Sequence, residues 1–287
     1  MNKFKYFFQY LFIIFLFSIF KILGLKYSSN LSGLMFSIIG PLFRSNKLCH
    51  SNISKAFTKI NFDEKSKILK KMWFNYGSMF AEYMFIKNFR NDNQYSKRIM
   101  IENQNILDQI KKNSKPVIFI SGHFNNFELM AMHIEKSGID LAAIYRPLNN
   151  IFLNPIMENI RKKYICKNQI KKGISGTKEI LKCFKNNTSV ALMIDQRVSE
   201  GIKCNFFNEE ASTTTIPAQF VKKFDANIVP IYIERINIYN FKLKIYKPLK
   251  FSKDDTIENI TLKLNKILEE MILKNPGQWI WTHNRWK

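Results

Sequence analysis

Short apolar runs alternate with helix-like segments through the middle of the chain, and no other feature constrains the fold as strongly. The runs are PVIFI (116–120), LAAIY (141–145), VALMI (190–194), IVPIYI (228–233) and FKLKIY (241–246). Between the first four runs, apolar residues recur at helical spacing in segments 125–136, 151–164, 176–185 and 214–224. Strands that alternate with helices in this way form a mainly parallel sheet with helices on its faces. We therefore predict an α/β fold with a mainly parallel central sheet flanked by helices.

The N-terminal region is a long apolar segment, MNKFKYFFQYLFIIFLFSIFKILGLKYSS. Lysines flank it on both sides: Lys3, Lys5, Lys21 and Lys26. A helix that spans a bilayer needs about 20 apolar residues, and residues 4–25 barely reach that length. A signal peptide is the rival interpretation, but no cleavage site of small residues is evident. We predict a hydrophobic membrane anchor over 1–26 that either crosses the bilayer once or lies in its interface.

The remaining 27–287 are long enough for one large domain with its own core. Residues 30–90 have a helical pattern, with Asn61 or Asp63 as the cap of one helix. The strand-and-helix alternation follows from residue 115. We therefore predict a single domain over 27–287 whose N-terminal part is helical.

The charge balance is strongly basic, with 45 Lys and Arg against 22 Asp and Glu and a formal net charge of +23. Such a field attracts anionic lipid headgroups, acidic proteins or nucleic acid. A coding bias toward lysine is the alternative explanation. The four cysteines are far apart in sequence and form neither a zinc-binding pattern nor a disulfide framework: Cys49, Cys166, Cys183 and Cys204. We expect free thiols in a reducing compartment.

The stretch VIFISGHFNNFE places a histidine at the end of a predicted strand. In open α/β sheets, functional sites gather at the carboxyl ends of strands, where His123 would lie. If Glu128 lies in the first turns of the next helix, its carboxylate can accept from one imidazole nitrogen and leave the other free as a base. His133 extends the spacing, but the sequence has no zinc-binding HExxH motif and no cluster of ligands around it. We predict His123 as a general base that is supported by Glu128, with no metal and no cofactor.

Five blocks in this order carry a family resemblance: SGHFNNFELMA, YRPLNNIFLNPIMENIRKK, IDQRVSEGIKCNFFNEEASTTTIPA, VPIYIER and PGQWIWTHNRWK. Together they resemble the lauroyl/myristoyl acyltransferases of lipid A biosynthesis, within the lysophospholipid acyltransferase superfamily. The resemblance covers the whole chain, including the apolar N-terminus. It implies transfer of an acyl chain from an acyl carrier protein to a hydroxyl of a lipid A precursor, at the cytoplasmic side of a bacterial inner membrane.

The resemblance also implies substrate-binding residues. Arg146 follows a predicted strand, and its guanidinium suits a phosphate or a developing oxyanion. The other candidates are Asn149, Asn150, Arg161, Asp195, Gln196, Thr213 and Thr214. Thr213, Thr214 and the adjacent Thr215 either cap the next helix or donate hydrogen bonds to substrate. The wider superfamily often has a Pro-Glu-Gly block where this chain has Asp195 and Gln196, which argues against a simple glycerol-phosphate acceptor.

Three other functions fit parts of the sequence. An acyltransferase of the same type can act on another lipid, such as a lysophospholipid or an aminolipid. A nucleic-acid-binding protein would explain the positive charge, but no recognition motif accompanies the scattered lysines and the apolar N-terminus would have no role. A non-catalytic membrane protein on the same fold is the third, and the retained His123, Glu128, Arg146 and Asp195 argue against it.

Overall fold

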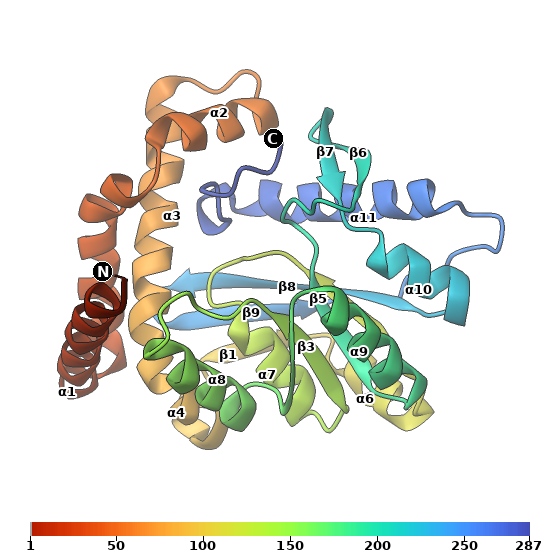
Figure 1. The fold of residues 1–287 in the computed structure, drawn as a ribbon, viewed down its shortest axis with the longest axis horizontal. Coiled ribbons are helices and arrows are strands. Elements are labelled where there is room, and N and C mark those ends of the chain that lie inside the picture. Colours follow the sequence, from red (N-terminus) through yellow and green to blue (C-terminus); the bar gives the residue numbers. More distant parts are fainter. Residues whose placement is uncertain (1) are drawn as a thin grey trace.

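A mainly parallel sheet of seven strands forms the centre of the molecule, which is a computed structural model that describes residues 2–287 (Figure 1). The strand order is β1-β9-β8-β2-β5-β3-β4. All neighbouring strands are parallel except β8 and β9, which form an antiparallel pair. Its strands are β1 (Ile99–Glu102), β2 (Ile118–Ser121), β3 (Leu141–Tyr145), β4 (Asn168–Lys171), β5 (Ser189–Met193), β8 (Ile228–Asn237) and β9 (Asn240–Ile245). The α/β fold predicted from the sequence is confirmed.

Helices cover the sheet and a separate hairpin lies outside it. Figure 1 shows α11 on one side of the sheet, opposite α6 and α7. The α-helices that follow β1 in the chain are α6 (Gln104–Asn113), α7 (Glu128–Lys136), α8 (Leu153–Tyr164), α9 (Ile174–Lys185), α10 (Ile216–Phe224) and α11 (Ile257–Lys274). The hairpin consists of β6 (Ile202–Phe206) and β7 (Glu209–Thr213). Strand β2 lies between β5 and β8 and all four of its residues are buried, which explains why its sequence is a continuous apolar run rather than an alternating one.

The region before the sheet is helical, as predicted. Its helices are α1 (Asn2–Phe43), α2 (Asn46–Ala56), α3 (Phe62–Glu82), the short η1 (Tyr83–Phe85), α4 (Ile86–Asn91) and α5 (Asn93–Ser96). Asn61 caps α3: its side chain accepts from the backbone N–H of Glu64, whose carboxylate accepts from the backbone N–H of Asn61. This reciprocal pair fixes the start of α3, the helix that runs beside both α1 and the sheet (Figure 1).

The N-terminal helix α1 is bent into two limbs. Gly24 has φ 74° and ψ 168°, outside the helical region, and a positive φ of this kind is favourable only for glycine. The limbs, 2–23 and 25–43, both pack against α3, and the rings of Phe17 and Phe36 each lie near the ring of Phe80. Within the described residues, α1 is the one helix long and apolar enough to cross a membrane.

Candidate active site

Two loops at the carboxyl edge of the sheet bring His123 and Asp195 together. His123 follows β2 and Asp195 follows β5, and these two strands are parallel neighbours. The backbone N–H of Ile194 donates to the carbonyl of Ser121 at 3.0 Å, which extends the pairing to the site itself. A Cβ atom on Gly122 would lie 3.1 Å from Asp195 Oδ2, so glycine permits the two loops to approach this closely. The site therefore lies where open parallel sheets place their ligands.

The carboxylate of Asp195 holds the histidine through two hydrogen bonds. His123 Nδ1 lies 2.8 Å from Asp195 Oδ1, and the backbone N–H of His123 donates to Oδ2 at 2.7 Å. The indole N–H of Trp279 donates to the same Oδ2 at 2.8 Å. Asp195 is buried, whereas 20% of the His123 side chain is exposed. Within residues 2–287 the Nε2 atom makes no hydrogen bond, so it is the nitrogen available to a substrate.

The charges of this pair stabilise each other. Burial alone would raise the pKa of Asp195, but the His123 imidazole, the backbone N–H and the Trp279 indole lower it to about 2. Burial alone would lower the pKa of His123, but the Asp195 carboxylate outweighs it, and the net pKa is raised. Asp195 is therefore ionised at neutral pH, and it favours the protonated imidazolium that a general base forms during a reaction.

Glu128 does not contact His123, in contrast to the hydrogen bond predicted from the sequence. Its Oε1 accepts from Arg161 Nε at 2.9 Å and Nη2 at 2.6 Å, and the Tyr83 hydroxyl also donates to it. Glu128 is the first residue of α7, and its side chain is directed toward Arg161 of α8 and Tyr83 of η1 rather than toward the loop. The prediction identified the wrong hydrogen-bond partner, because Asp195 occupies that place. The Glu128 charge still contributes to the raised pKa of His123.

Tyr83, Glu128 and Arg161 form a second buried cluster beside the pair. Burial raises the pKa of Tyr83 well above its usual value, and the Glu128 carboxylate raises it further. Burial would lower the pKa of Arg161, but Glu128 and Tyr83 raise it. The Arg161 guanidinium also lies 5.6 Å from the centre of the Tyr145 ring. The cluster is thus a compensated ion pair that joins η1, α7 and α8.

The other predicted residues of the loop after β3 divide into exposed and buried ones. Arg146 and Asn149 are exposed on the loop, where a substrate group can reach them. Asn150 is buried, and its Oδ1 accepts from the backbone N–H groups of Phe152 and Leu153 at 3.0 and 3.2 Å. Asn150 therefore shapes the start of α8.

The predicted residues at the ends of β5 and β7 are half-buried or buried. Gln196 is half-buried next to Asp195. Thr213 is buried, and its hydroxyl accepts from Arg285 Nη2 at 2.7 Å. The Thr214 hydroxyl accepts from the backbone N–H of Ile216 at 3.4 Å, at the start of α10. Both threonine hydroxyls thus have contacts within the protein, whereas the N-cap of α10 is Thr215, which makes no side-chain cap hydrogen bond.

The sequence interpretation missed the contribution of the C-terminal segment to the site. Trp279 holds Asp195, and His283 Nε2 accepts from the backbone N–H of Arg197 at 2.9 Å, in the loop that follows Asp195. Phe124 also forms an isolated antiparallel bridge with Trp279. The block PGQWIWTHNRWK was recognised only as part of the family pattern. Its tryptophans and its histidine were the available signal.

A buried ion pair behind the loop was also missed. Glu82 of α3 and Arg235 of β8 are 0% and 5% exposed, and Arg235 Nη1 lies 2.5 Å from Glu82 Oε1. Asn126 donates to Glu82 at 2.9 Å, and Arg235 Nε donates to Asn125 at 3.3 Å. Asn125 itself has φ 42°. The two asparagines of GHFNNFE therefore anchor the loop that presents His123, and the signal was a glutamate inside an otherwise apolar helical stretch.

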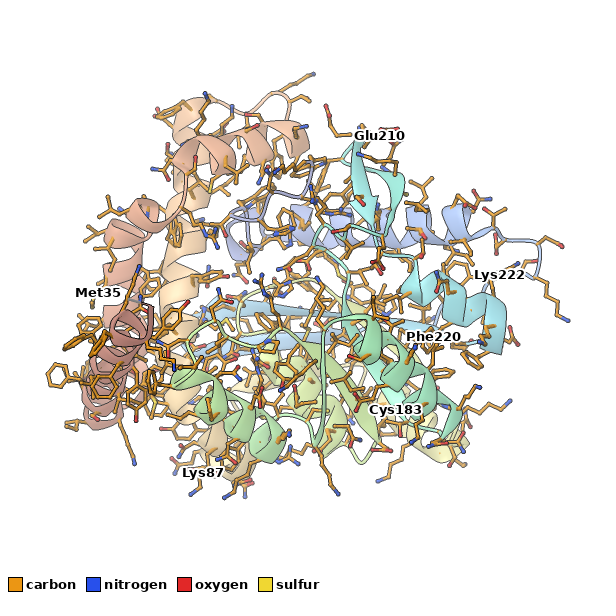
Figure 2. All side chains as sticks on the ribbon, viewed as in Figure 1. Met35, Lys87, Cys183, Glu210, Phe220 and Lys222 are labelled. Carbon is orange, nitrogen blue, oxygen red and sulfur yellow. The ribbon has the colours of Figure 1, made fainter. Side chains whose placement is uncertain are left out.

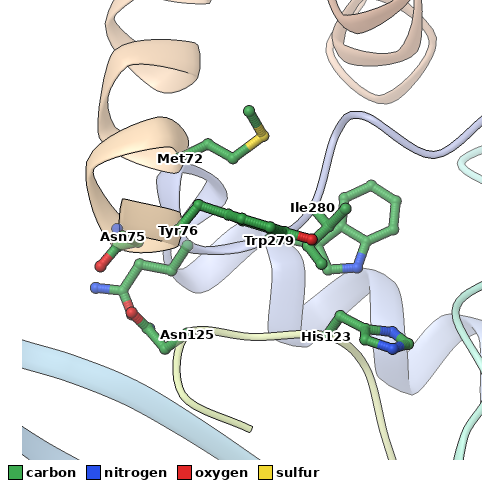
Figure 3. A pocket seen from close by; sticks show the side chains of 8 residues that line it. Met72, Asn75, Tyr76, His123, Asn125, Trp279 and Ile280 are labelled. Carbon is green, nitrogen blue, oxygen red and sulfur yellow. The ribbon is translucent and has the colours of Figure 1, made fainter. Parts of the chain in front are cut away.

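A small pocket of about 10 Å³ adjoins His123 between α3 and the C-terminal segment. Figure 3 shows Tyr76, Trp279 and Ile280 around it with His123 at one end. A volume of this size holds about one water molecule. Burial raises the pKa of Tyr76 to about 12, and the nearby Asp195 carboxylate adds to this, so its hydroxyl stays protonated. The pocket suits a single oxygen atom and is too small for a larger group.

The described residues contain no group of three His, Cys, Asp or Glu side chains that would hold a metal ion. Cys49, Cys166 and Cys204 are buried and Cys183 is half-buried, and all four are free thiols. Burial raises the pKa of each, which makes them poor nucleophiles. Figure 2 shows that Cys183 lies on the side of the molecule away from the N-terminal limbs.

Comparison with known proteins gives a consistent result. The lipid A biosynthesis acyltransferase 2 of Shigella flexneri is 21% identical over 197 residues, which cover 67% of this chain and 62% of that protein. The lipid A biosynthesis palmitoleoyltransferase of Escherichia coli is 22% identical over 86% of this chain and 80% of its own length. The Escherichia coli lipid A biosynthesis lauroyltransferase is also 22% identical, over 85% and 79%. The sequence pattern of one family matches residues 1–287. The chain belongs to the bacterial lipid A biosynthesis acyltransferase family.

Proposed function

We propose that the protein transfers a fatty acyl chain from the thioester of an acyl carrier protein to a hydroxyl of a lipid A precursor, as a late secondary acylation. The observation that carries this proposal is the His123–Asp195 pair, with Nδ1 held at 2.8 Å and Nε2 directed away from it. Family membership supports the acyl-transfer class, and two of the relatives are a lauroyltransferase and a palmitoleoyltransferase of lipid A biosynthesis.

The reaction follows from the arrangement of the pair. His123 Nε2 takes the proton of the acceptor hydroxyl while its oxygen attacks the thioester carbonyl, and Asp195 stabilises the imidazolium that results. The tetrahedral intermediate then expels the carrier's thiolate, which receives the proton back from Nε2. One C–O bond forms and one C–S bond breaks, and the histidine ends in its initial state. This scheme needs no nucleophile from the protein and no cofactor.

The surrounding charges have separate roles in this proposal. Glu128 adds negative potential near His123 and keeps Arg161 in place. Arg146 and Asn149 are exposed on the loop after β3 and Gln196 is half-buried beside Asp195, and all three would bind phosphate or sugar groups of the acceptor. The net charge of +23 would attract an acidic carrier protein and an anionic membrane surface. The catalytic domain would lie on the cytoplasmic side of the inner membrane.

The direct test uses the full chain in detergent with acyl carrier proteins that bear several chain lengths and a tetra-acylated lipid A precursor. We expect the precursor's mass to increase by one acyl chain, and His123→Ala to abolish the increase. His133→Gln is the matched control, because His133 lies on α7 and its Nε2 bonds to Gln104 at 2.7 Å, away from the pair. Acylation by the His123→Ala variant would disprove the assignment of the base. Acylation only of lysophospholipids or aminolipids would disprove the assignment of the acceptor.

A further inference from the structure

Each limb of α1 has a row of exposed apolar side chains on its outer face. The first row comprises Phe4, Phe8, Leu11, Phe12, Phe15 and Ile22, and the second comprises Tyr27, Leu31, Leu34, Ile38 and Leu42. Within each row the spacing is mainly three or four residues, so the side chains lie along one side of a helix. A contiguous apolar surface of this extent on a folded protein marks an interaction site.

The inner face of the first limb is fixed to the rest of the protein along most of its length. Near its start, the carbonyl of Tyr6 accepts from Asn150 Nδ2 at 2.8 Å, and the Phe7 ring lies 5.5 Å from the Phe152 ring. Near its end, Phe20 is 1% exposed and lies 6.1 Å from the Phe80 ring. Residues 6 to 20 of a helix cover roughly 21 Å at 1.5 Å per residue. A helix that crosses the hydrocarbon core, about 30 Å thick, would have to leave these contacts and expose Phe20.

The bend at Gly24 returns the chain along the same side of the protein. Ser78 of α3 donates to the carbonyl of Ser29 in the second limb at 2.9 Å. A Cβ atom on Gly77 would lie 2.2 Å from the carbonyl of Ser32, so the second limb packs on α3 with its backbone in close contact. Figure 1 shows both limbs beside α3 at one end of the molecule. Neither limb projects away from the domain as a free anchor would.

We propose that both limbs of α1 lie in the interface of a single leaflet of an anionic bilayer and that neither crosses it. Charge supports a bilayer as the partner, because lysines stand at the start of the first limb and around the bend: Lys3, Lys5, Lys21 and Lys26. Their long side chains reach the headgroups while the apolar rows enter the acyl chains. Between Lys26 and Arg44 the second limb has no charged residue. This attachment holds whether or not the protein transfers acyl groups.

The apolar surface continues to the rim of the candidate active site. Leu148 and Ile151 are 40% and 51% exposed in the loop after β3, next to Asn150, which bonds to the first limb. The same loop carries Arg146. A membrane seated on α1 therefore meets the protein beside the site, and under the proposed function a lipid acceptor would enter from the leaflet without leaving it.

Cysteine labelling in native membranes tests this arrangement. The single substitutions Lys3→Cys, Lys26→Cys and Lys112→Cys are made in a Cys183→Ser background, because the other native cysteines are buried. Lys112 is exposed on α6 and reports the side on which the domain lies. Sealed vesicles of each orientation are treated with a membrane-impermeant maleimide. We expect all three sites to react in the same vesicle preparation, with labelled fractions that agree within about twofold, as for one monotopic surface.

Reaction of Lys3→Cys in the preparation of opposite orientation to Lys112→Cys would overturn the proposal, because the first limb would then span the bilayer. If lipid shields Lys3→Cys in both preparations, quenching of Phe12→Trp fluorescence decides the depth, with wild-type fluorescence subtracted. Stronger quenching by lipids brominated near the headgroup supports the proposal, and stronger quenching by lipids brominated near the chain end overturns it. Failure to bind anionic vesicles, with a dimer in sedimentation, would also overturn it by showing that the rows pair with a second copy.

Discussion

Replacing Asp195 by asparagine should inactivate the protein by fixing the wrong tautomer of His123. Two donors, the backbone N–H of His123 and the Trp279 indole, point at the same oxygen, Oδ2. In Asp195→Asn the amide oxygen must take that place, because an NH₂ group there would face both donors. The NH₂ group then faces His123 Nδ1, which becomes the acceptor. The proton moves to Nε2, and the nitrogen that should act as the base is blocked.

The expected loss is large and specific. In serine proteases, the same change in the aspartate of the histidine–acid pair costs roughly 10⁴ in kcat. A loss on the order of 10³–10⁴ corresponds to about 4–5 kcal/mol at 1.36 kcal/mol per tenfold. The KM for the acceptor should change little, because Asp195 is 2% exposed and does not face substrate. The Asp195 charge also raises the pKa of His123. Without it, the pH below which the residual activity falls should be lower than in the wild type.

The assay is steady-state acyl transfer over a range of pH, with the variant Glu128→Gln in parallel. Glu128 bonds to Arg161 rather than to His123, so its loss should reduce stability by leaving a buried guanidinium unpaired, by about 3–5 kcal/mol. A thermal melt in detergent separates this effect from catalysis. If Asp195→Asn keeps kcat within tenfold of the wild type, or if only Glu128→Gln shifts the acid limb, the assignment of Asp195 as the partner is wrong.

Two other predictions follow from buried polar groups. Trp279→Phe removes one hydrogen bond to the Asp195 carboxylate, so kcat should fall on the order of tenfold at constant KM. Trp281→Phe is the control, because the Trp281 indole donates to the Pro276 carbonyl, and this variant should keep kcat. Equal losses in both variants would show that Trp279 has only a packing role. Burial lowers the pKa of His133 from 6.5 to about 4. The neutral side chain therefore contributes its full stability at pH values above 6.5, and this contribution is lost as the pH falls toward 4. Urea unfolding should show that the wild type loses about 2 kcal/mol more than His133→Gln between pH 7 and pH 5, and parallel curves for the two proteins would contradict the shift.

Five strands of the sheet could be predicted because their buried side chains give continuous or alternating apolar sequences. Strands β2, β3, β5, β8 and β9 all coincide with apolar or alternating runs. Strand β4, with the sequence NQIK, has one apolar residue at the edge of the sheet, and no periodicity signal exists for such a strand. Edge strands and the β6–β7 hairpin take their structure from their neighbours rather than from their own sequence.

The site was predicted in part for a related reason. The end of a strand places His123 correctly, since strand ends are visible in the sequence. The partner of the imidazole depends on the loop geometry, which Asn125, with φ 42°, and the Glu82–Arg235 ion pair determine. Local spacing favoured Glu128, and the long-range pairing of β2 with β5 favoured Asp195. The sequence alone does not show which of the two carboxylates, Glu128 or Asp195, lies next to the imidazole.

The contribution of Trp279 to the site also has a consequence while the protein itself is being translated. A ribosome makes the segment that carries the indole more than eighty residues after Asp195, so the carboxylate and the imidazole emerge long before their third partner. Until that segment docks, the loop after β5 lacks the donor that fixes its carboxylate and the contact through His283. A nascent chain already attached to a lipid surface by its first residues would therefore reach full activity only when synthesis is nearly finished. Proteolysis that removes the last ten residues should have the same effect on a mature molecule.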